Sequence, residues 1–455
     1  MEQTIAAIAT PPGEGGIAVV RLSGETAYAV AQQVFVPQNP ARSLSGAKGY
    51  TALFGHFVAD GKVRDEVVAL CFRAPHSYTG EDVVELSCHG GSVVSEELLR
   101  ACLAAGAAPA AAGEFTKRAY LNGRISLTQA EAVMDLIEAH SAAAAAAAAN
   151  AMEGALYRAV HAVQEKLLAL AGHIAAYTDF PEEDVPELSP AALLQTLQEC
   201  AAALQTLTDG YDAGAVLRRG VRTAIVGSPN VGKSTLLNLL AGFEKAIVTP
   251  VAGTTRDVVE QEIQLGGVRL LLADTAGLRD TADAVEAEGI RRARMQLERA
   301  GLVLAVFDAS RAAAPQDLAF AAECAHRPAV AILNKTDLPV LFDASLLRPY
   351  FSVVAAVSAK SPEALPQVTA AVEQVLGTAH FDPDAALLAN ERQLSAANTA
   401  LAALRQALDA VRQGVTLDAV GVCVDDALRA LYALTGEDAA ADVVEEVFSK
   451  FCVGK

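Results

Sequence analysis

The feature that most constrains this chain is the octapeptide Gly-Ser-Pro-Asn-Val-Gly-Lys-Ser at residues 227–234. A run rich in β-branched residues precedes it at 221–226, and an apolar helical stretch follows it at 235–240. In a strand–turn–helix of this kind, backbone N–H groups of the turn and of the helix N-terminus point at phosphate oxygens. Lys233 adds a positive charge, and the Ser234 hydroxyl is a ligand for Mg²⁺. The segment is therefore predicted to be a P-loop that binds a nucleoside triphosphate.

Three further motifs each follow a run with the composition of a β-strand. Asp274-Thr275-Ala276-Gly277 follows the run at 268–273, Asn334-Lys335-Thr336-Asp337 follows 329–333, and Ser358-Ala359-Lys360 follows 351–357. Because open α/β folds bind ligands at the carboxyl edge of a parallel sheet, we expect all four motifs to meet at one nucleotide. The residues expected to contact it are Asn230, Val231, Gly232, Lys233, Ser234, Thr235, Thr249, Thr254, Thr255, Asp274, Thr275, Ala276, Gly277, Asn334, Lys335, Asp337, Ser358, Ala359 and Lys360.

The Asn-Lys-x-Asp motif selects the base. The Asp337 carboxylate can accept both N–H bonds of the guanine N1/N2 edge, whereas adenine leaves it unpaired at a cost of ~1–3 kcal/mol. The predicted nucleotide is therefore GTP or GDP. Asn334 is expected to touch the base or to brace the P-loop, and the stem of Lys335 is expected to pack over the purine.

The remaining nucleotide motifs predict a magnesium site. Ser234 and Thr255 are the predicted Mg²⁺ ligands, Asp274 would hold the ion through water, and Gly277 would sense the γ-phosphate. The alternative interpretations are that Asp274 caps a helix and that Thr255 is an ordinary turn residue.

The hydrolytic machinery differs from that of Ras-type GTPases. Those proteins carry Gln after the Asp-x-x-Gly motif to orient water, and here the position is Leu278. Four nearby acids are alternative candidates, and composition does not choose among them: Asp280, Asp283, Glu286 and Glu288. Asn230 and the Gly/Thr-rich loop at 249–257 offer neutral oxygens that suit a monovalent cation beside the phosphates. The predicted ligands of this cation are Asn230, Thr249, Val251 and Thr254.

Length and pattern predict several domains. With 455 residues the chain is too long for a single core. Short strand-like runs between Gly/Pro turns predict an α+β domain at 1–119, and a P-loop, Ras-like α/β domain is predicted at 217–379. Residues 120–216 and 380–455 have helical periodicity, so one helical bundle is predicted to be interrupted by the inserted GTPase domain.

Apolar residues spaced three and four apart define the expected packing seam of each helical block. The first seam is Leu156, Val160, Val163, Leu167, Leu170 and Ile174, and the second is Ala397, Leu401, Leu404, Leu408 and Val411. The alanine tract at 142–149 is predicted to be a helix because Ala is the strongest helix former. The first long helix is expected to end near Asp179, just before Pro181.

Composition excludes several classes of protein. No apolar run reaches the ~20 residues of a membrane-spanning helix, and the first residues lack the basic region of a secretion signal. The seven cysteines lack paired metal spacing, so we expect reduced thiols and a cytoplasmic location. Cys88 is expected to be buried packing. The net charge of −19 argues against broad electrostatic binding of nucleic acid.

Further motifs are spread over the whole chain. They are Thr10-Pro11-Pro12-Gly13 with Gly15-Gly16 and Arg21, Tyr78-Thr79-Gly80-Glu81-Asp82 with His89-Gly90-Gly91, Gly113-Glu114-Phe115-Thr116 with Gln129-Ala130-Glu131-Ala132, and Cys452-Val453-Gly454-Lys455. With these motifs and the GTPase core, the chain resembles the MnmE family, also called TrmE, of tRNA modification GTPases. The family's activity implies a potassium-activated GTPase that modifies the 5-position of the wobble uridine of certain tRNAs.

The resemblance also implies further ligands and partners. The N-terminal domain would bind 5-formyltetrahydrofolate or a related folate and would mediate homodimerisation. The folate residues implied are Arg21, Glu85, Arg124 and Lys455. Carboxylate and cationic side chains suit the pterin edge and the folate carboxylates, respectively. The FAD-dependent protein MnmG is the implied partner in a carboxymethylaminomethyl-type addition.

Three residues are predicted to be catalytic. The resemblance makes Glu286 the residue that orients the attacking water, with Thr255 beside the phosphates. Cys452 would act as a nucleophile or as an acid/base near the folate-borne one-carbon unit.

Two other functions fit the same core. A ribosome-assembly or translation-associated GTPase would act only as a nucleotide switch, but it would usually add a basic RNA-binding domain that the charge does not indicate. A nucleotide-gated scaffold without chemistry of its own would need Lys233 but not Cys452.

Overall fold

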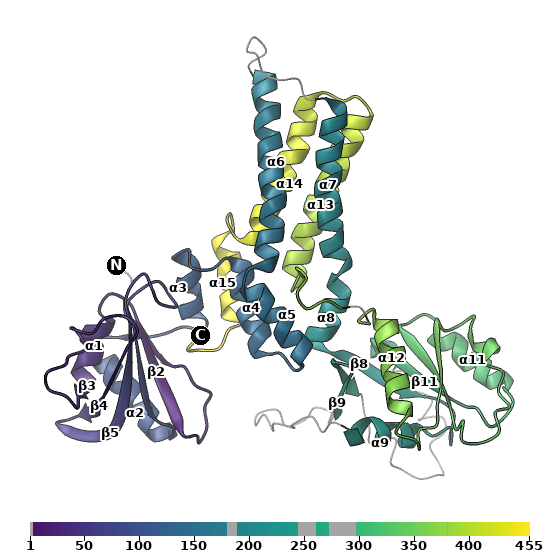
Figure 1. Cartoon of the computed structure of the whole chain (residues 1–455), viewed down its shortest axis with the longest axis horizontal. Coiled ribbons are helices and arrows are strands. Elements are labelled where there is room, and N and C mark those ends of the chain that lie inside the picture. The colour runs from purple at the N-terminus through teal and green to yellow at the C-terminus, as the bar shows by residue number, and fades with distance from the viewer. Residues whose placement is uncertain (1–2, 180–188, 244–260, 273–296, 380) are drawn as a thin grey trace. The chain divides into compact units, whose positions relative to one another are not determined.

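The chain divides into two compact units in the computed structural model, which describes residues 3–179, 189–243, 261–272, 297–379 and 381–455. Unit 1 comprises Met1–Met134, Tyr157–Cys200 and Thr399–Lys455, and unit 2 comprises Asp135–Leu156 and Ala201–Asn398. Figure 1 shows the elements of both units. None of the helices in these residues is long and apolar enough to cross a lipid bilayer.

Unit 1 begins with a seven-stranded sheet of order β3-β4-β5-β6-β2-β1-β7. Its strands are β1 (Ile5–Ile8), β2 (Ile17–Ser23), β3 (Phe35–Pro37), β4 (Thr51–Ala59), β5 (Lys62–Phe72), β6 (Val83–His89) and β7 (Ala108–Pro109). Helices α1 (Ala27–Val34) and α2 (Ser92–Ala104) contact each other and cover one face. This face carries the buried alternate residues of the central strands, including Val20, Val67 and Leu86. The predicted α+β fold is confirmed.

The opposite face of this sheet carries the polar side chains of the same strands. Arg21 on β2 lies directly opposite Glu85 on β6 in the antiparallel register, and both are half-buried. Because side chains alternate between the two faces of a strand, the buried neighbours Val20 and Leu22 fix Arg21 on the other side of the sheet. The hydrophobic pattern of β2 and β6 thus sets the position of this charged pair.

The helices that follow are α3 (Glu114–Leu121), α4 (Leu127–Ile137), α6 (Ala155–Asp179), α7 (Pro190–Asp209), α13 (Glu391–Arg412), α14 (Leu417–Thr435) and α15 (Ala441–Ser449). All six residues of the predicted seam on α6 are buried, as are four of the five on α13, with Val411 half-buried. Within unit 1, Lys166 of α6 pairs with Glu199 of α7, and the Gln164 amide of α6 donates to the Thr435 hydroxyl of α14. Helices from before and after the α/β domain therefore pack in one bundle (Figure 1).

Unit 2 contains a six-stranded sheet of order β13-β12-β11-β8-β10-β9, in which only the β9–β10 pair is antiparallel. The strands are β8 (Val221–Val226), β9 (Gln261–Leu265), β10 (Val268–Leu272), β11 (Leu302–Asp308), β12 (Ala329–Asn334) and β13 (Val353–Ala356). The helices are α5 (Ala142–Met152), α8 (Tyr211–Arg219), α9 (Lys233–Phe243), α11 (Pro315–Cys324), the 3₁₀ helix η2 (Ala344–Leu347) and α12 (Ala364–Leu376).

Both faces of this sheet are covered, as in doubly wound α/β folds. Leu236 of α9 and Val368 of α12 belong to the core on one face, and Ala321 of α11 belongs to the core on the other. The described strands that precede the motifs are parallel, so the predicted carboxyl edge is confirmed for β8, β12 and β13.

The strand β11, which lies between β8 and β12, is not among the strands predicted from the sequence. All seven of its residues are buried, so its apolar run is continuous and lacks the alternation that marks a half-buried strand. The run at 351–357 yields a shorter strand than predicted, since β13 has four residues. The alanine tract forms α5 as predicted, with the Ser141 hydroxyl accepting from the Ala144 N–H at its start.

All seven cysteines are free thiols, as predicted. Five are buried, Cys423 is half-buried and Cys452 is exposed. Cys88 is buried packing, its thiol lies 3.5 Å from the Ala18 carbonyl, and burial raises its pKa to about 11.

Candidate functional site

The loop between β8 and α9 has the backbone of a phosphate-binding turn. Asn230 and Gly232 have φ angles of +62° and +99°. A Cβ at Gly232 would lie 2.1 Å from Asn334 Nδ2, so only glycine fits at this position. Val231 between them is buried and anchors the loop to the core below.

Lys233 stands at the N-terminus of α9 and folds back over this loop. Its Nζ donates hydrogen bonds to the carbonyls of Gly227 at 2.8 Å and Ser228 at 2.9 Å. Burial lowers the pKa of the Lys233 ammonium. Ser234 and Thr235 follow in the first helical turn and are exposed. The cation, the hydroxyls and the helix N-terminus therefore lie together at the carboxyl end of β8, where phosphate groups bind well.

Asn334 joins the P-loop to the loop that follows β13. Its Nδ2 donates to the Val231 carbonyl at 2.9 Å, and its Oδ1 accepts from the Ala359 N–H at 2.9 Å. The side chain is only 2% exposed, so loss of either bond would leave a buried polar group unpaired. Of the two roles expected for Asn334, the structure shows the bracing of the P-loop.

Asp337 is held as an ionised acceptor. Its Oδ1 accepts from the Ser358 hydroxyl at 2.8 Å, and its Oδ2 lies 3.1 Å from the Lys360 ammonium. The hydrogen bond from Ser358, followed by that from Lys360, lowers the pKa of Asp337. Two of the predicted motifs thus meet through this carboxylate.

Lys335 pairs with a residue that the sequence did not single out. Its Nζ lies 2.6 Å from Oδ2 of Asp308, the last residue of β11, and its backbone has a φ of +70°. Burial raises the pKa of Asp308, but hydrogen bonds from Lys335 and Ser310 outweigh it, so the pKa lies below its usual range. A single acid ending an apolar run was the available signal for Asp308. The pair fixes the Lys335 stem beside the Asp337 loop.

Nine predicted residues lie outside the described part of the chain. They are Thr249, Val251, Thr254, Thr255, Asp274, Thr275, Ala276, Gly277 and Glu286. Their predicted roles toward Mg²⁺, the monovalent cation and the attacking water stay predictions.

A second group of predicted residues meets on the open face of the N-terminal sheet. Arg21 Nε lies 2.7 Å from Glu85 Oε1. The Arg21 guanidinium carbon is 5.7 Å from the Tyr78 ring centroid and 5.6 Å from that of Phe115. An ion pair flanked by two aromatic rings can take a flat, polar ligand. Tyr78 and Phe115 occur in the motifs quoted above but were not predicted as site residues.

The C-terminal tail reaches the same place. Arg21 also donates to the Gly454 carbonyl at 3.3 Å, and the Gly113 N–H donates to the Cys452 carbonyl at 3.3 Å. The tail therefore lies beside the Arg21–Glu85 pair, with the Cys452 side chain exposed and Lys455 half-buried. Arg124 packs against the loop that carries Tyr78, with its Cγ 3.3 Å from where a Cβ on Gly80 would stand.

Comparison with known proteins agrees with this architecture. The family described as "MnmE helical domain" matches residues 127–452, and "GTP-binding protein TrmE N-terminus" matches residues 4–124. The chain is 42% identical over 458 residues to tRNA modification GTPase MnmE of Symbiobacterium thermophilum, with both chains covered completely. It is 41% identical over 459 residues to that of Chloroflexus aurantiacus and 39% over 461 residues to that of Carboxydothermus hydrogenoformans, again over 100% of each chain. The chain therefore belongs to the MnmE (TrmE) family of tRNA modification GTPases.

Proposed function

We propose that this GTPase modifies the 5-position of the wobble uridine of certain tRNAs, using a tetrahydrofolate one-carbon donor and the FAD-dependent partner MnmG. The product would be a carboxymethylaminomethyl-type addition. The observation that supports the proposal best is the presence of two distinct sites in one chain: a P-loop site whose Asp337 carboxylate suits guanine, and an Arg21–Glu85 site beside the Cys452 tail. Full-length similarity to proteins named as tRNA modification GTPases supports the same activity.

At the P-loop, the described residues fit a guanine nucleotide. The Asp337 carboxylate is oriented by Ser358, and the Gly232 position leaves no room for a side chain beside Asn334. Lys233 would exchange its bonds with the loop carbonyls for the β- and γ-phosphates. Ser234, with Thr255, would hold Mg²⁺, which neutralises charge on the phosphates when bound.

We further infer that the nucleotide site takes potassium through Asn230, Thr249, Val251 and Thr254. The described member, Asn230, supports this because it lies exposed in the turn of the P-loop and carries a neutral side-chain amide oxygen. A cation at this point would stabilise negative charge that develops during hydrolysis, as an arginine finger does.

Potassium dependence is testable by salt replacement. GTP turnover should fall at least about tenfold when sodium replaces potassium at equal ionic strength, and Asn230→Ala should remove that difference. Equal turnover of the wild-type protein in the two salts would contradict the potassium site. In the same assay, Glu286→Ala should slow hydrolysis far more than it weakens nucleotide binding. Normal turnover of that variant would show that Glu286 does not orient the attacking water.

At the N-terminal site, the proposed ligand is 5-formyltetrahydrofolate or a related folate. Glu85 can pair with the amidine-like edge of a pterin, and Arg21, Arg124 and Lys455 can pair with the carboxylates of the folate. The exposed Cys452 thiol would act there as a nucleophile or as an acid/base.

Partners must supply much of the grip on tRNA, because a net charge of −19 opposes broad binding to its phosphates. We propose that MnmG supplies part of it and that the N-terminal domains form a homodimer. Because the protein would act on tRNA, we propose that it is located in the cytoplasm.

Mass spectrometry of tRNA wobble nucleosides provides the main test. A strain that lacks this chain should lose the 5-substituted uridine, the wild-type gene should restore it, and Arg21→Ala should not. Normal wobble nucleosides in the deletion strain, together with unprocessed ribosomal subunits, would instead indicate an assembly GTPase that acts only as a switch.

A further inference from the structure

The helix α3 contacts the wall of the Arg21 site on one of its faces. The Tyr78 hydroxyl is hydrogen-bonded to the Thr116 hydroxyl at 2.9 Å, and the Asn122 Nδ2 donates to the Thr79 carbonyl at 2.8 Å. Thr116 is fully buried. These bonds attach α3 to the loop of residues 77–82, here called the 77–82 loop. This loop immediately precedes the strand that carries Glu85 and brings Tyr78 to the Arg21 guanidinium.

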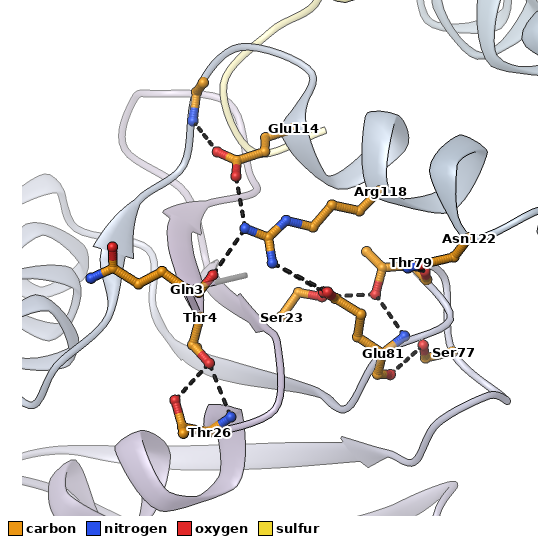
Figure 2. A network of polar contacts seen from close by, with 11 residues as sticks. Gln3, Thr4, Ser23, Thr26, Ser77, Thr79, Glu81, Glu114, Arg118 and Asn122 are labelled. Carbon is orange, nitrogen blue, oxygen red and sulfur yellow. Dashed lines mark hydrogen bonds and ion pairs between the residues drawn. The ribbon is translucent and has the colours of Figure 1, made fainter. Parts of the chain in front are cut away.

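Arg118 is the central residue of the same attachment (Figure 2). Its guanidinium lies 3.2 and 3.3 Å from the Glu81 carboxylate, 2.8 Å from Glu114 Oε1 and 2.9 Å from the Gln3 carbonyl. The Ser23 hydroxyl donates to Glu81 Oε2 at 2.6 Å, the same oxygen that lies 3.2 Å from Arg118. Arg118 is 5% exposed, so its charge depends on these partners rather than on water. A lysine ammonium, a compact charge, cannot reach three separate segments as the planar fork does.

The N-cap and the first turn of α3 also contact the C-terminal segment. Gly113, which begins the helix with a φ of +63°, donates to the Cys452 carbonyl, and a Cβ there would lie 2.8 Å from the Phe448 carbonyl. Lys117 forms an ion pair with Glu445 of α15. The two walls of the Arg21 site are thus fixed to one short helix, one wall through Arg118 and the other through Gly113 and Lys117.

We propose that Arg118 is a positioning residue for the Arg21 site. By holding Glu81, it fixes the 77–82 loop so that the Tyr78 ring stays beside the Arg21 guanidinium in the geometry that binds the ligand. Arg118 itself does not touch the ligand. The inference rests on the proposed function only in taking that ligand to be a folate.

The direct test is Arg118→Lys, which keeps the charge and removes the fork. Amide hydrogen exchange in the 77–82 loop should become faster without any ligand. With 5-formyltetrahydrofolate as the probe, Kd and the KM for folate should rise about tenfold or more, because small misplacements of a binding group are costly. The kcat for tRNA modification at saturating folate and the GTP turnover should stay unchanged. A merely structural lesion would instead lower kcat by reducing the folded fraction.

Two further variants make the result specific. Arg100→Lys, on the exposed surface of α2, is the matched control and should change neither exchange nor affinity. In a Tyr78→Ala background, Arg118→Lys should weaken folate binding much less than it does alone, because the group it positions is gone. If Arg118→Lys does not fold, Glu81→Gln provides a second variant, because it keeps the shape of the side chain that Arg118 holds. It should also speed amide exchange in the 77–82 loop and weaken folate binding, but by smaller factors.

The outcomes separate the two proposals. If wild-type protein does not bind 5-formyltetrahydrofolate, the folate assignment is wrong, and the loop exchange still decides whether Arg118 holds the loop. If the wild type binds folate, and loop exchange and affinity are unchanged in both Arg118→Lys and Glu81→Gln, the positioning role is overturned. Full additivity with Tyr78→Ala would also overturn it.

Discussion

Single side chains decide the geometry of the guanine site because each one bridges two loops. Asn334 joins the P-loop to the Ser358–Ala359–Lys360 segment, and Asp337 is oriented by two residues of that same segment. In the proposed role of Asp337, base selectivity would depend on a carboxylate whose position and ionisation are both set by its neighbours. Replacing one oxygen of this carboxylate with nitrogen should therefore change which base the site prefers.

Asp337→Asn should reverse the preference for the base. An amide offers one acceptor and two donors instead of two acceptors, so it leaves guanine unpaired and can donate to the additional carbonyl of xanthine. GTP affinity should fall by about 5- to 150-fold, as expected for ~1–3 kcal/mol, and xanthosine triphosphate should become the better ligand. Competition between the two nucleotides in an equilibrium binding assay measures this.

Ser358→Ala is the matched control for that experiment. It removes the hydroxyl that orients the carboxylate, but it leaves both acceptors in place. Both nucleotides should bind more weakly with an unchanged preference for GTP. A variant Asp337→Asn that still prefers GTP would show that another residue selects the base.

At the scale of elements, the bundle depends on the spacing of apolar residues along α6. Steps of three and four residues keep the side chains on one stripe of the helix, and all six members of the stripe are buried. Residues 165, 166, 168 and 169 of the same helix are exposed. Consecutive leucines at 167 and 168 are therefore an internal comparison, with the first fully buried and the second 56% exposed.

Leu167→Ala should destabilise unit 1 by about 2–5 kcal/mol, because it removes buried methyl groups and leaves a cavity. Leu168→Ala removes the same atoms from the exposed face and should change stability by no more than about 0.5 kcal/mol. Urea unfolding followed by helical circular dichroism measures both. Equal losses of unfolding free energy in the two variants would mean that Leu167 does not pack against a neighbouring helix.

At the scale of the whole molecule, the two sites belong to different units. The P-loop lies in unit 2, whereas Cys452 and the Arg21–Glu85 pair lie in unit 1. Each unit is made of more than one segment of the chain, because the α/β domain is inserted between segments of the helical bundle. The chain passes between the units at four points, after Met134, Leu156, Cys200 and Asn398, and these connections are the covalent routes by which hydrolysis could be coupled to modification.

Cys452→Ser should separate the two activities. The variant should keep the fold and the GTP turnover but lose most tRNA modification, because a hydroxyl ionises far less readily than a thiol and serine is nearly isosteric. Steady-state GTP hydrolysis and mass spectrometry of wobble nucleosides measure the two activities on the same protein. Full modification by Cys452→Ser would show that the tail is a structural cover rather than a source of chemistry.

The spacing of residues within short stretches of sequence was enough to predict three features: the nucleotide motifs, the strands that precede most of them and the apolar stripe of α6. Those features depend on residues within a few positions of one another, where backbone geometry and periodicity are the same in any fold. The same reasoning failed at β11, because a strand buried on both faces has no alternation and no motif follows it.

Only the tertiary structure decided which distant groups meet. Arg21 and Gly454 are 433 residues apart in sequence and share a hydrogen bond, and Lys335 is paired with Asp308 at the end of a different strand. Arg118 binds Glu81 and the Gln3 carbonyl, which no spacing relates to one another. Such contacts follow from the order of the strands and from the way the chain connects them. The sequence alone therefore shows which residue types are present but not which distant residues they contact.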